Sequence, residues 1–268
     1  MNIRPPAWSP ETLKGRLAGK VAVITGGAGG MGKAASKMFA AAGASVAILD
    51  IQTEAGAETV AEIDANGGKA LFFETDVTKT DAVREALDKT VEAFGPIDTL
   101  FNHAGTIIVK PLHETTDEEY GRLMDINATS AFIVCREVLK HFLKNGGGSI
   151  VITSSIGGEK GFGLESAYCM SKGAVLQLAR TIAIEYRDHN IRANAVCPAF
   201  VKTDHGLREI KELDALGQNW NEADLVGVQG RICEPEEVAA AALFLASDDA
   251  SFVSGLALYV DNGWYARG

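Results

Sequence analysis

The stretch "VAVITGGAGGMGKAA", residues 21–35, decides the fold, because it joins an apolar, β-branched run to a helical pattern through a glycine-rich turn. Gly26, Gly30 and Gly32 fit the spacing TGxxxGxG. Glycines at these positions let the backbone turn tightly and approach a pyrophosphate, whose charge the first amides of the following helix can bind. A glycine-rich turn without a ligand would look the same, so this motif needs support from the rest of the chain.

Apolar, β-branched runs alternate with segments of helical periodicity along the whole sequence. Seven such runs are present: "KVAVIT" at 20–25, "SVAILD" at 45–50, "KALFFETD" at 69–76, "DTLFNHAG" at 98–105, "GSIVITSS" at 148–155, "IRANAVCP" at 191–198 and "LALYVDNG" at 256–263. Strands that are apolar on both faces are typical of βαβ units around a buried parallel sheet. We therefore expect an α/β fold, a single Rossmann-like, doubly wound domain over residues 1–268, with seven parallel strands and helices on both faces of the sheet.

Two segments fall outside this alternation. Residues 1–18 are an amino-terminal extension with prolines and charges but without the apolar core of a signal peptide. Residues 203–230 are a mixed polar and aromatic insertion that contains His205 and Trp220. Long insertions inside a compact domain are often functional, so we expect this one to form a lid over a substrate site.

Charge and composition argue against several function classes. The 268 residues carry a formal net charge of -10, whereas a nucleic-acid surface needs clustered lysine and arginine. No run approaches the ~20 apolar residues of a membrane-spanning helix. The four cysteines lack CxxC spacing, which favours reduced thiols in a cytoplasmic protein: Cys135, Cys169, Cys197 and Cys233. The histidines lack metal-ligand spacing, so we expect no metal site: His103, His113, His141, His189 and His205.

Asp50 ends the second predicted strand, where an acidic side chain can accept hydrogen bonds from the adenosine ribose of a dinucleotide. Its carboxylate would repel the 2′-phosphate of NADP by about 4 kcal/mol per unit charge at a separation of ~4 Å. Neither the glycine turn nor the residues after Asp50 offer an arginine in compensation. The pattern predicts NAD as the cofactor, with an ordinary strand-end acid as the alternative.

The stretch "ESAYCMSKGAV", residues 165–175, places Tyr168 and Lys172 four residues apart in a helical pattern. On a helix these positions share one face, so the phenol and the ammonium can address the same small volume. Taken alone, the pair is better explained as an exposed surface pair. Ser154 and Ser155 end the preceding strand and could simply cap its turn, and Asn127 could face solvent from its helix.

Together these residues resemble the short-chain dehydrogenase/reductase family, in its shorter single-domain type, over about residues 17–265. The resemblance depends on seven motifs in the family's order: TGxxxGxG at 25–32, "DV" at 76–77, "NHAG" at 102–105, Asn127, "SS" at 154–155, "YCMSK" at 168–172 and "NAVCPAFVKT" at 194–203. Each motif is weak by itself, but the ordered set is very specific. It implies a nicotinamide-dependent oxidoreductase that interconverts a secondary alcohol and a ketone by hydride transfer.

The resemblance implies a role for each of four catalytic residues. Tyr168 is the general acid/base, Ser155 holds the substrate oxygen, and Lys172 binds the nicotinamide ribose and lowers the pKa of Tyr168. Asn127 supports a water-linked proton relay to Lys172. These roles are chemically reasonable, because a free tyrosine with a pKa near ~10 is a poor base at neutral pH, and nearby positive charge favours the phenolate.

The resemblance also implies which residues bind the cofactor and the substrate. The cofactor set is Gly26, Gly30, Met31, Gly32, Asp50, Ile51, Asp76, Val77, Asn102, Ala104, Gly105, Tyr168, Lys172, Pro198, Val201 and Thr203. The substrate set is Ser155, Gly157, Glu165, Tyr168 and His205. Because Glu165 and His205 can form hydrogen bonds, we expect a sugar- or polyol-like substrate rather than a steroid. Glu165 as a helix-terminal acid and His205 as a solvated loop residue are the alternatives.

Three positions depart from the family's motifs. His103 stands where a second asparagine is usual, Ala199 follows Pro198 in place of glycine, and Asn262 replaces a glycine near the carboxyl end. Alanine removes an easy positive φ, whereas asparagine tolerates one better than most residues. We expect these changes to alter loop detail only.

Two other functions are compatible with the motif set. A 3-oxoacyl-[acyl-carrier-protein] reductase shares it, although Asp50 and the acidic chain argue against that enzyme. A non-catalytic NAD-binding regulatory protein could share the fold, since fold does not fix function. The long helical patterns at 118–145 and 165–189 have apolar residues on more than one face, which suggests burial against partner subunits. The family commonly forms tetramers, so we expect a homo-oligomer.

Overall fold

The computed structural model describes residues 10–218 and 222–267. Within them, seven strands form one parallel sheet in the order β3-β2-β1-β4-β5-β6-β7. The strands are β1 (Val21–Thr25), β2 (Ser45–Asp50), β3 (Lys69–Glu74), β4 (Thr99–Asn102), β5 (Gly148–Thr153), β6 (Ile191–Pro198) and β7 (Ala257–Val260). The predicted fold class is therefore confirmed, with each strand lying inside its predicted run.

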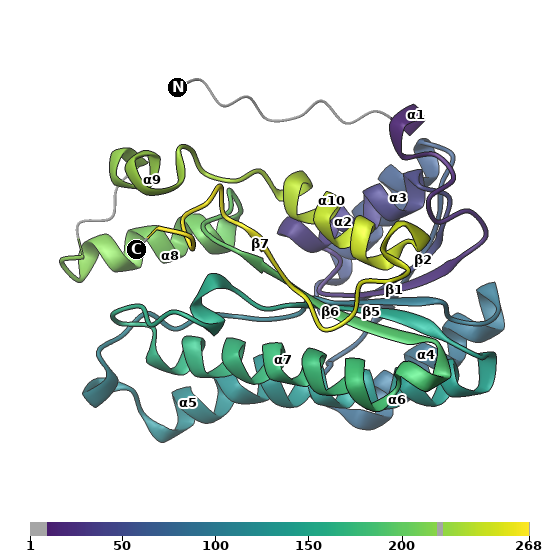
Figure 1. Ribbon diagram of the computed structural model, residues 1–268, viewed down its shortest axis with the longest axis horizontal. Helices are drawn as coiled ribbons and strands as arrows, with labels where there is room; N and C mark the ends of the chain where they lie inside the picture. The colour runs from purple at the N-terminus through teal and green to yellow at the C-terminus, as the bar shows by residue number, and fades with distance from the viewer. Residues whose placement is uncertain (1–9, 219–221, 268) are drawn as a thin grey trace.

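Helices cover both faces of the sheet (Figure 1). One face carries α2 (Gly30–Ala41), α3 (Thr53–Ala65) and α10 (Pro235–Ala246). The other carries α4 (Thr80–Phe94), α6 (Ser130–Asn145) and α7 (Ser166–Glu185), with α5 (Asp117–Met124) beside α7. Each layer packs an apolar side onto strands whose interior residues are buried, as in β1, where all five residues are buried. Burial on both faces explains why the central strands are continuously apolar.

The remaining elements are short. Four 3₁₀ turns span Leu112–Glu114, Ile156–Gly158, Arg187–His189 and Asp248–Ala250. In the described part of the extension, α1 (Pro10–Leu13) precedes Leu17, and both Leu13 and Leu17 are buried in the α2–α10 layer. Among the described helices, none is both long enough and apolar enough to cross a bilayer.

The order of the strands reverses between β1 and β4. From this point the chain connections run toward opposite edges of the parallel sheet, so the carboxyl ends of β1 and β4 border a crevice in which α/β proteins bind ligands. Thr25, the last residue of β1, holds the two strand ends together. Its hydroxyl donates to Asn102 Oδ1 at 3.1 Å and accepts from the backbone amides of His103 at 2.9 Å and Ala104 at 3.1 Å.

The segment predicted as one helix over 118–145 is interrupted. Between α5 and α6 lies a π-helical turn (Asp125–Thr129), and the amide of Ser130 donates to the carbonyl of Asp125, five residues back. Such single turns insert one residue into a helix and are frequent at functional sites. Here the inserted turn contains Asn127, which is 2% exposed.

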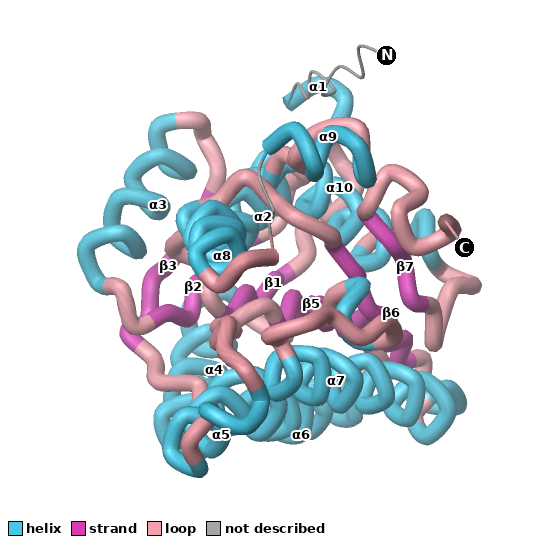
Figure 2. The backbone as a smooth tube through the Cα atoms, turned by 90° about the vertical axis from the view of Figure 1, so that its left-hand side faces the viewer, coloured by secondary structure: helices cyan, strands magenta, loops and turns pink. Residues whose placement is uncertain are grey.

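The predicted lid forms two helices, α8 (Asp204–Ala215) and α9 (Glu222–Gln229). Figure 2 shows α8 in front of the strands, between the two helical layers. Phe200, Leu213 and Leu225 form a small apolar core of their own that joins the lid helices to the end of β6. Trp220 lies outside the described residues.

Candidate active site

A cleft of about 860 Å³ opens at the carboxyl ends of the strands, at the reversal between β1 and β4. Most of the predicted site residues line it: Gly26, Gly30, Met31, Asp50, Ile51, Asp76, Val77, Ala104, Gly105, Tyr168, Lys172, Pro198, Val201, Thr203 and His205. The described residues contain no group of three or more histidine, cysteine, aspartate or glutamate side chains suited to a metal ion.

The glycine turn leaves room for a ligand at the start of α2. Gly26 and Gly30 have φ angles of 67° and 50°, which favour glycine. A Cβ on Gly26 would lie 2.9 Å from the Cα of Ala104. Gly29, the N-cap residue of α2, has no side chain that could cap the helix. The first backbone amides of α2 are therefore available to bind an anion. These features fit the pyrophosphate of a dinucleotide.

Gly32 gives a test of this turn. A Cβ there would lie 1.9 Å from the carbonyl oxygen of Gly26, which is too close for any adjustment of a side chain. Gly32→Ala must therefore displace the turn, and we expect the dissociation constant for NAD to rise at least about tenfold, about 1.4 kcal/mol. Fluorescence titration checks this against Gly227→Ala, whose Cβ would meet no atom within 4 Å. Unchanged NAD affinity in Gly32→Ala would show that the glycine turn does not bind the cofactor.

Asp50 lies in the cleft at the end of β2 and is 7% exposed. Its two carboxylate oxygens accept from the backbone amides of Ala28 and Gln52, each at 3.1 Å. Each oxygen keeps a second lone pair, so the fixed carboxylate can still accept from ribose hydroxyls. The cationic side chains of the described cleft are Arg122 on α5 and Lys172 on α7, and neither comes from the glycine turn or the end of β2.

The two serines at the end of β5 have different tasks. Ser154 donates to the backbone carbonyl of Lys172 at 2.8 Å and so fixes the strand end to α7. The Ser155 hydroxyl accepts from the amide of Gly157 at 3.0 Å, donates to the carbonyl of Pro198 at 3.5 Å, and lines a small chamber together with Tyr168. Two hydroxyls in the wall of one chamber can hold one substrate oxygen between them.

Lys172 is 6% exposed and lies beside Tyr168 on α7. Its Nζ donates to the carbonyl of Thr153 at 3.0 Å and lies 5.6 Å from the centre of the Tyr168 ring. Burial lowers the pKa of Lys172 to about 8, against weaker opposing effects from Cys197 and Glu209. The ammonium is thus held inside the site, where its charge is poorly screened.

The structure corrects one expectation about Tyr168. In the protein alone its pKa is raised well above the ordinary value, first because burial disfavours the phenolate and second because Glu209 adds negative charge. The hydrogen bond to Ser155 acts in the opposite direction, and Lys172 is not among the main influences. Burial therefore outweighs any lowering of this pKa by Lys172 in the protein alone, and Tyr168 starts as a proton donor.

Asn127 does not face solvent, because the π-helical turn directs its side chain toward the loop after β4. Its Oδ1 accepts from the amide of Thr106 at 2.7 Å, and its Nδ2 donates to the Thr106 carbonyl at 2.8 Å and to Ser171 Oγ at 2.9 Å. A Cβ on Gly105 would lie 3.3 Å from Asn127 Oδ1 and 3.5 Å from Lys172 Nζ. Asn127 and Lys172 thus flank the same glycine.

Besides Asn127, three predicted residues lie behind the cleft rather than in its wall. Gly32 packs under the glycine turn, as described above. The Asn102 side chain donates to the carbonyl of Ala131 at 3.0 Å and supports the end of β4. Gly157 is buried and binds Ser155 through its amide. These residues support the site from beneath.

The three departures from the family's motifs are accommodated locally. His103 stacks on Phe101 at 5.2 Å, its Nδ1 lies 3.0 Å from Thr153 Oγ, and burial lowers its pKa to about 3, so it stays neutral. Asn262 adopts the positive φ of 50° that its asparagine tolerates. Ala199 does not need a positive φ.

A smaller chamber of about 30 Å³ adjoins Tyr168 on the lid side. We call it the distal chamber; its walls are Ser155, Ile156, Phe162, Glu165, Tyr168, Ala199, Phe200, Glu209 and Trp264. Trp264 lies between Phe162, at 5.6 Å edge-on, and Phe200, at 5.7 Å in a stack. Glu165 precedes α7 and Glu209 comes from α8, and their carboxyl groups are hydrogen-bonded to each other.

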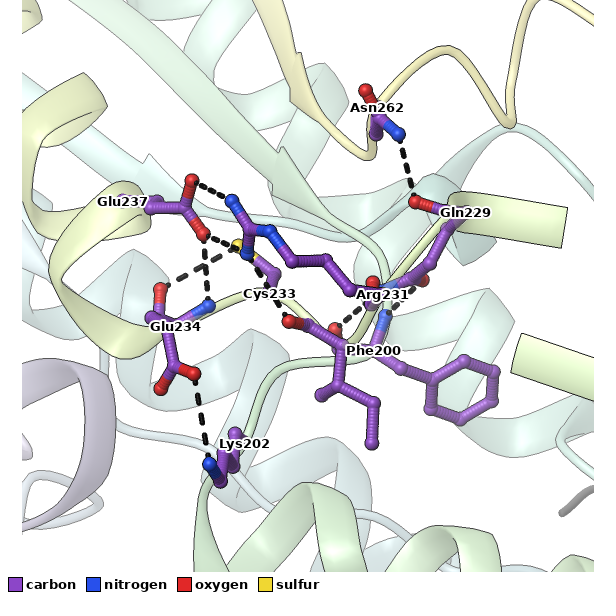
Figure 3. Close-up of polar contacts among 9 residues, drawn as sticks. Phe200, Lys202, Gln229, Arg231, Cys233, Glu234, Glu237 and Asn262 are labelled. Atoms are coloured by element: carbon purple, nitrogen blue, oxygen red, sulfur yellow. Dashed lines mark hydrogen bonds and ion pairs between the residues drawn. The ribbon is translucent and has the colours of Figure 1, made fainter. Parts of the chain in front are cut away.

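Figure 3 shows the polar contacts that hold Phe200, a residue of the distal chamber wall. The buried side chain of Gln229 accepts from the Phe200 amide at 3.2 Å and donates to its carbonyl at 2.8 Å. Asn262 Nδ2 donates to the Gln229 carbonyl at 2.8 Å. Arg231 forms two bonds of 2.6 Å to Glu237 on α10. The carboxyl end of the predicted lid segment, at Gln229 and Arg231, is therefore bound to Phe200 and to α10.

Sequence reasoning missed several residues of the site. Thr25 begins the TGxxxGxG motif, and its position alone could have drawn attention to it. Thr106 and Thr153 act through backbone or short side-chain contacts that no motif marks. Glu209 lies in the insertion at residues 203–230, and no spacing rule connects it with Glu165.

The chain matches known proteins along most of its length. A family model described as "Enoyl-(Acyl carrier protein) reductase" matches residues 26–265. The chain is 37% identical over 252 residues to "2,5-dichloro-2,5-cyclohexadiene-1,4-diol dehydrogenase LinX" of Sphingobium indicum, covering 94% of this chain and 98% of the relative. It is also 37% identical over 252 residues to "3beta-hydroxysteroid dehydrogenase 2" of Eggerthella lenta, covering 93% and 96%.

A solved structure agrees with these relatives. The crystal structure of levodione reductase superposes with a TM-score of 0.90 and 32% sequence identity, covering 94% of this chain and all of that chain. A similarity that covers 94% of this chain extends over the sheet and both helical layers. The chain belongs to the short-chain dehydrogenase/reductase family, whose dehydrogenases use nicotinamide cofactors on alcohol groups.

Proposed function

We propose that this protein is an NAD-dependent dehydrogenase that interconverts a secondary alcohol and a ketone, with Tyr168 as general acid/base. The observation that carries the proposal is the meeting of Ser155 and Tyr168 in the wall of the distal chamber, with the buried Nζ of Lys172 5.6 Å from the tyrosine ring. The glycine turn, the uncapped start of α2 and Asp50 would hold the cofactor.

The residues of the cleft divide the reaction among them. In reduction, Tyr168 donates its proton to the ketone oxygen while Ser155 donates a hydrogen bond to the same oxygen. In oxidation, Tyr168 must first become a phenolate, which its burial opposes and the ammonium of Lys172 favours. The nicotinamide, when bound, supplies or accepts the hydride. Asn127 keeps the loop after β4 against α7, and with it the wall of the cleft beside Lys172.

Asp50 supports NAD rather than NADP. We expect kcat/KM to favour NAD by at least ~100-fold, which corresponds to about 2.7 kcal/mol and lies below the unscreened repulsion by a 2′-phosphate. Asp50→Ala should narrow this preference. Glu74→Ala is the matched control, because Glu74 ends the neighbouring strand in register with Asp50 but does not line the cleft. Equal use of both cofactors by the unaltered protein would contradict the role of Asp50.

The substrate we propose is a compact secondary alcohol with further polar groups, of a sugar- or polyol-like kind. Relatives are named for a cyclohexadiene diol and for a hydroxysteroid, so the family's pocket takes rings of different sizes. Here the distal chamber of about 30 Å³ leaves little room for a steroid, and Glu165 and Glu209 present polar atoms to it. His205 lines the main cleft, where burial lowers its pKa to about 4 and keeps it neutral.

A panel of alcohols tests the proposal. The protein with NAD is offered cyclic alcohols, polyols, sugars and hydroxysteroids, and NADH formation is followed by absorbance. The proposal expects a compact polar ring alcohol to give the highest kcat/KM. Fastest turnover of hydroxysteroids would reject the substrate class, and no turnover with any alcohol or ketone would favour the regulatory protein. The acyl-carrier reductase would instead be revealed by preference for a 3-oxoacyl thioester with NADPH.

We infer in addition a homotetramer in the cytoplasm. The helices α6 and α7 expose large apolar side chains, with Phe132 50%, Met170 56% and Ile184 71% exposed. Apolar residues exposed on neighbouring helices are suited to a subunit interface. The four cysteines are free thiols in the structure, as in reducing compartments. Light scattering of the purified protein measures the number of subunits.

A further inference from the structure

Two carboxyl groups in the distal chamber lack a cationic partner. Glu165 is 4% exposed, Glu209 reaches it from α8, and the two are hydrogen-bonded. In the described part of the chain, no lysine, arginine or histidine forms an ion pair with either. The two nearby cations are engaged elsewhere: Arg208 lies 3.6 Å from Glu212, and Lys172 donates to the Thr153 carbonyl.

Two other buried carboxylates, those of Glu137 and Asp261, have the cations or backbone amides that this pair lacks. Glu137, 2% exposed, is surrounded by Arg84 at 3.4 Å, Arg136 at 3.0 Å and Lys140 at 2.6 Å. Asp261, 7% exposed, accepts from two backbone amides, those of Gly263 and Tyr265. A buried carboxylate without such partners is costly. Within the described residues, Glu137 and Asp261 thus have cations or backbone amides as partners, whereas Glu165 and Glu209 have neither.

The remaining walls of the distal chamber also favour positive charge. Phe162, Phe200 and Trp264 contribute aromatic rings, whose faces carry partial negative charge and attract ammonium groups. Among the described residues that line the chamber, none is basic. Its volume of about 30 Å³ exceeds the ~10–15 Å³ needed by one water molecule but is far too small for a ring. The chamber therefore suits one small group attached to a larger substrate.

We propose that the distal chamber is an ammonium site, and that the substrate is an amino alcohol whose primary ammonium lies between Glu165 and Glu209. This inference depends on the proposed function only for the reacting hydroxyl, which would meet Ser155 and Tyr168. A primary ammonium has three N–H donors and one positive charge. It would thus supply the positive charge that the two carboxyl groups lack, together with further hydrogen-bond donors. The ring of the substrate would extend into the main cleft.

Binding of the ammonium would release protons from the pair. Burial raises the pKa of Glu165 to about 7, against a lowering effect of its hydrogen bond with Glu209. Burial and the proximity of Glu165 raise the pKa of Glu209 well above its ordinary value, so the empty pair holds protons near neutral pH. The charged or titratable neighbours are Tyr168, Cys169 and Lys172 on α7, and Arg208 and Glu212 on α8. An ammonium favours the ionised pair, so its affinity should increase as the pH rises through neutrality. The affinity for a neutral diol should not.

Three alcohols on one ring test the proposal: cyclohexanol, cyclohexane-1,4-diol and 4-aminocyclohexanol, each with NAD. We expect kcat/KM for 4-aminocyclohexanol to exceed that for the diol at least about tenfold, because truncating one member of a buried charge pair typically costs more than that. Glu165→Gln and Glu209→Gln should each reduce the ratio between 4-aminocyclohexanol and cyclohexanol by a similar factor. Glu212→Gln, on the same helix but outside the chamber, should leave this ratio unchanged.

Calorimetry separates this inference from the proposed function. Cyclohexylammonium, which has no hydroxyl to oxidise, should bind the protein with NAD, release protons, and bind at least about tenfold more weakly to Glu209→Gln. If it does so while no alcohol is oxidised, the ammonium site stands and the dehydrogenase proposal fails. If alcohols are oxidised but the diol equals or surpasses the amino alcohol, or if neither glutamate affects the ratio, the ammonium site is wrong.

Discussion

Tyr168→Phe is expected to remove nearly all turnover while leaving the fold and NAD binding intact. The substitution deletes one hydroxyl, which is the proton donor for the ketone and the base for the alcohol. Loss of general acid/base action alone reduces kcat by about 10² to 10⁴. Stopped-flow or steady-state assays measure kcat, and fluorescence titration measures NAD binding. The aromatic ring, which packs beside Lys172 and against the distal chamber, is retained.

Tyr186→Phe is the matched control for this result. Tyr186 lies directly after α7, outside the cleft, so the same chemical change there should leave kcat unchanged. Near-normal turnover in Tyr168→Phe would remove the phenol from the mechanism. Loss of NAD binding in that variant would mean that the substitution acts through the shape of the cleft.

Lys172→Ala should reduce kcat/KM by about 10² or more and also weaken NAD binding, because one buried charge serves both. Since burial lowers the pKa of Lys172 to about 8, its ammonium is lost as the pH rises through that value. NAD affinity of the unaltered protein should therefore fall as the pH rises above about 8, and Lys172→Ala should abolish this dependence. Lys89→Ala, in an exposed pair with Glu85 on α4, is the control. If Lys172→Ala kept the original pH dependence of NAD affinity, Lys172 would be excluded as the source of that dependence.

The sheet could be predicted because its strands are buried on both faces. Runs such as "SVAILD" are apolar throughout, so they stand out from the helices without any tertiary information. The ends were less certain: the run at 69–76 extends two residues beyond β3, which stops at Glu74 where the chain enters the cleft. The catalytic residues were found because the family's motifs keep them in order along the chain.

The substrate side could be predicted only in part. Glu165 stands three residues before Tyr168 and was therefore identified, but its partner Glu209 is far away in sequence and meets it only through the packing of α8. The raised pKa of Tyr168 has the same origin, because it depends on burial and on Glu209 rather than on the neighbouring Lys172. Charges brought together by a lid leave no local signal in the sequence.

The π-helical turn at Asp125–Thr129 makes the length of this part of the chain indispensable. Each residue of an α-helix turns the chain by about 100°, so deleting one residue from the turn would rotate α6 by that angle relative to α5. Either the apolar side of α6 would leave the sheet, or Asn127 would leave Thr106 and Ser171. Insertions and deletions of the kind that surface loops tolerate should therefore abolish function at this position. The one extra residue of the turn lets the Asn127 side chain reach its partners while the apolar side of α6 stays packed on the sheet.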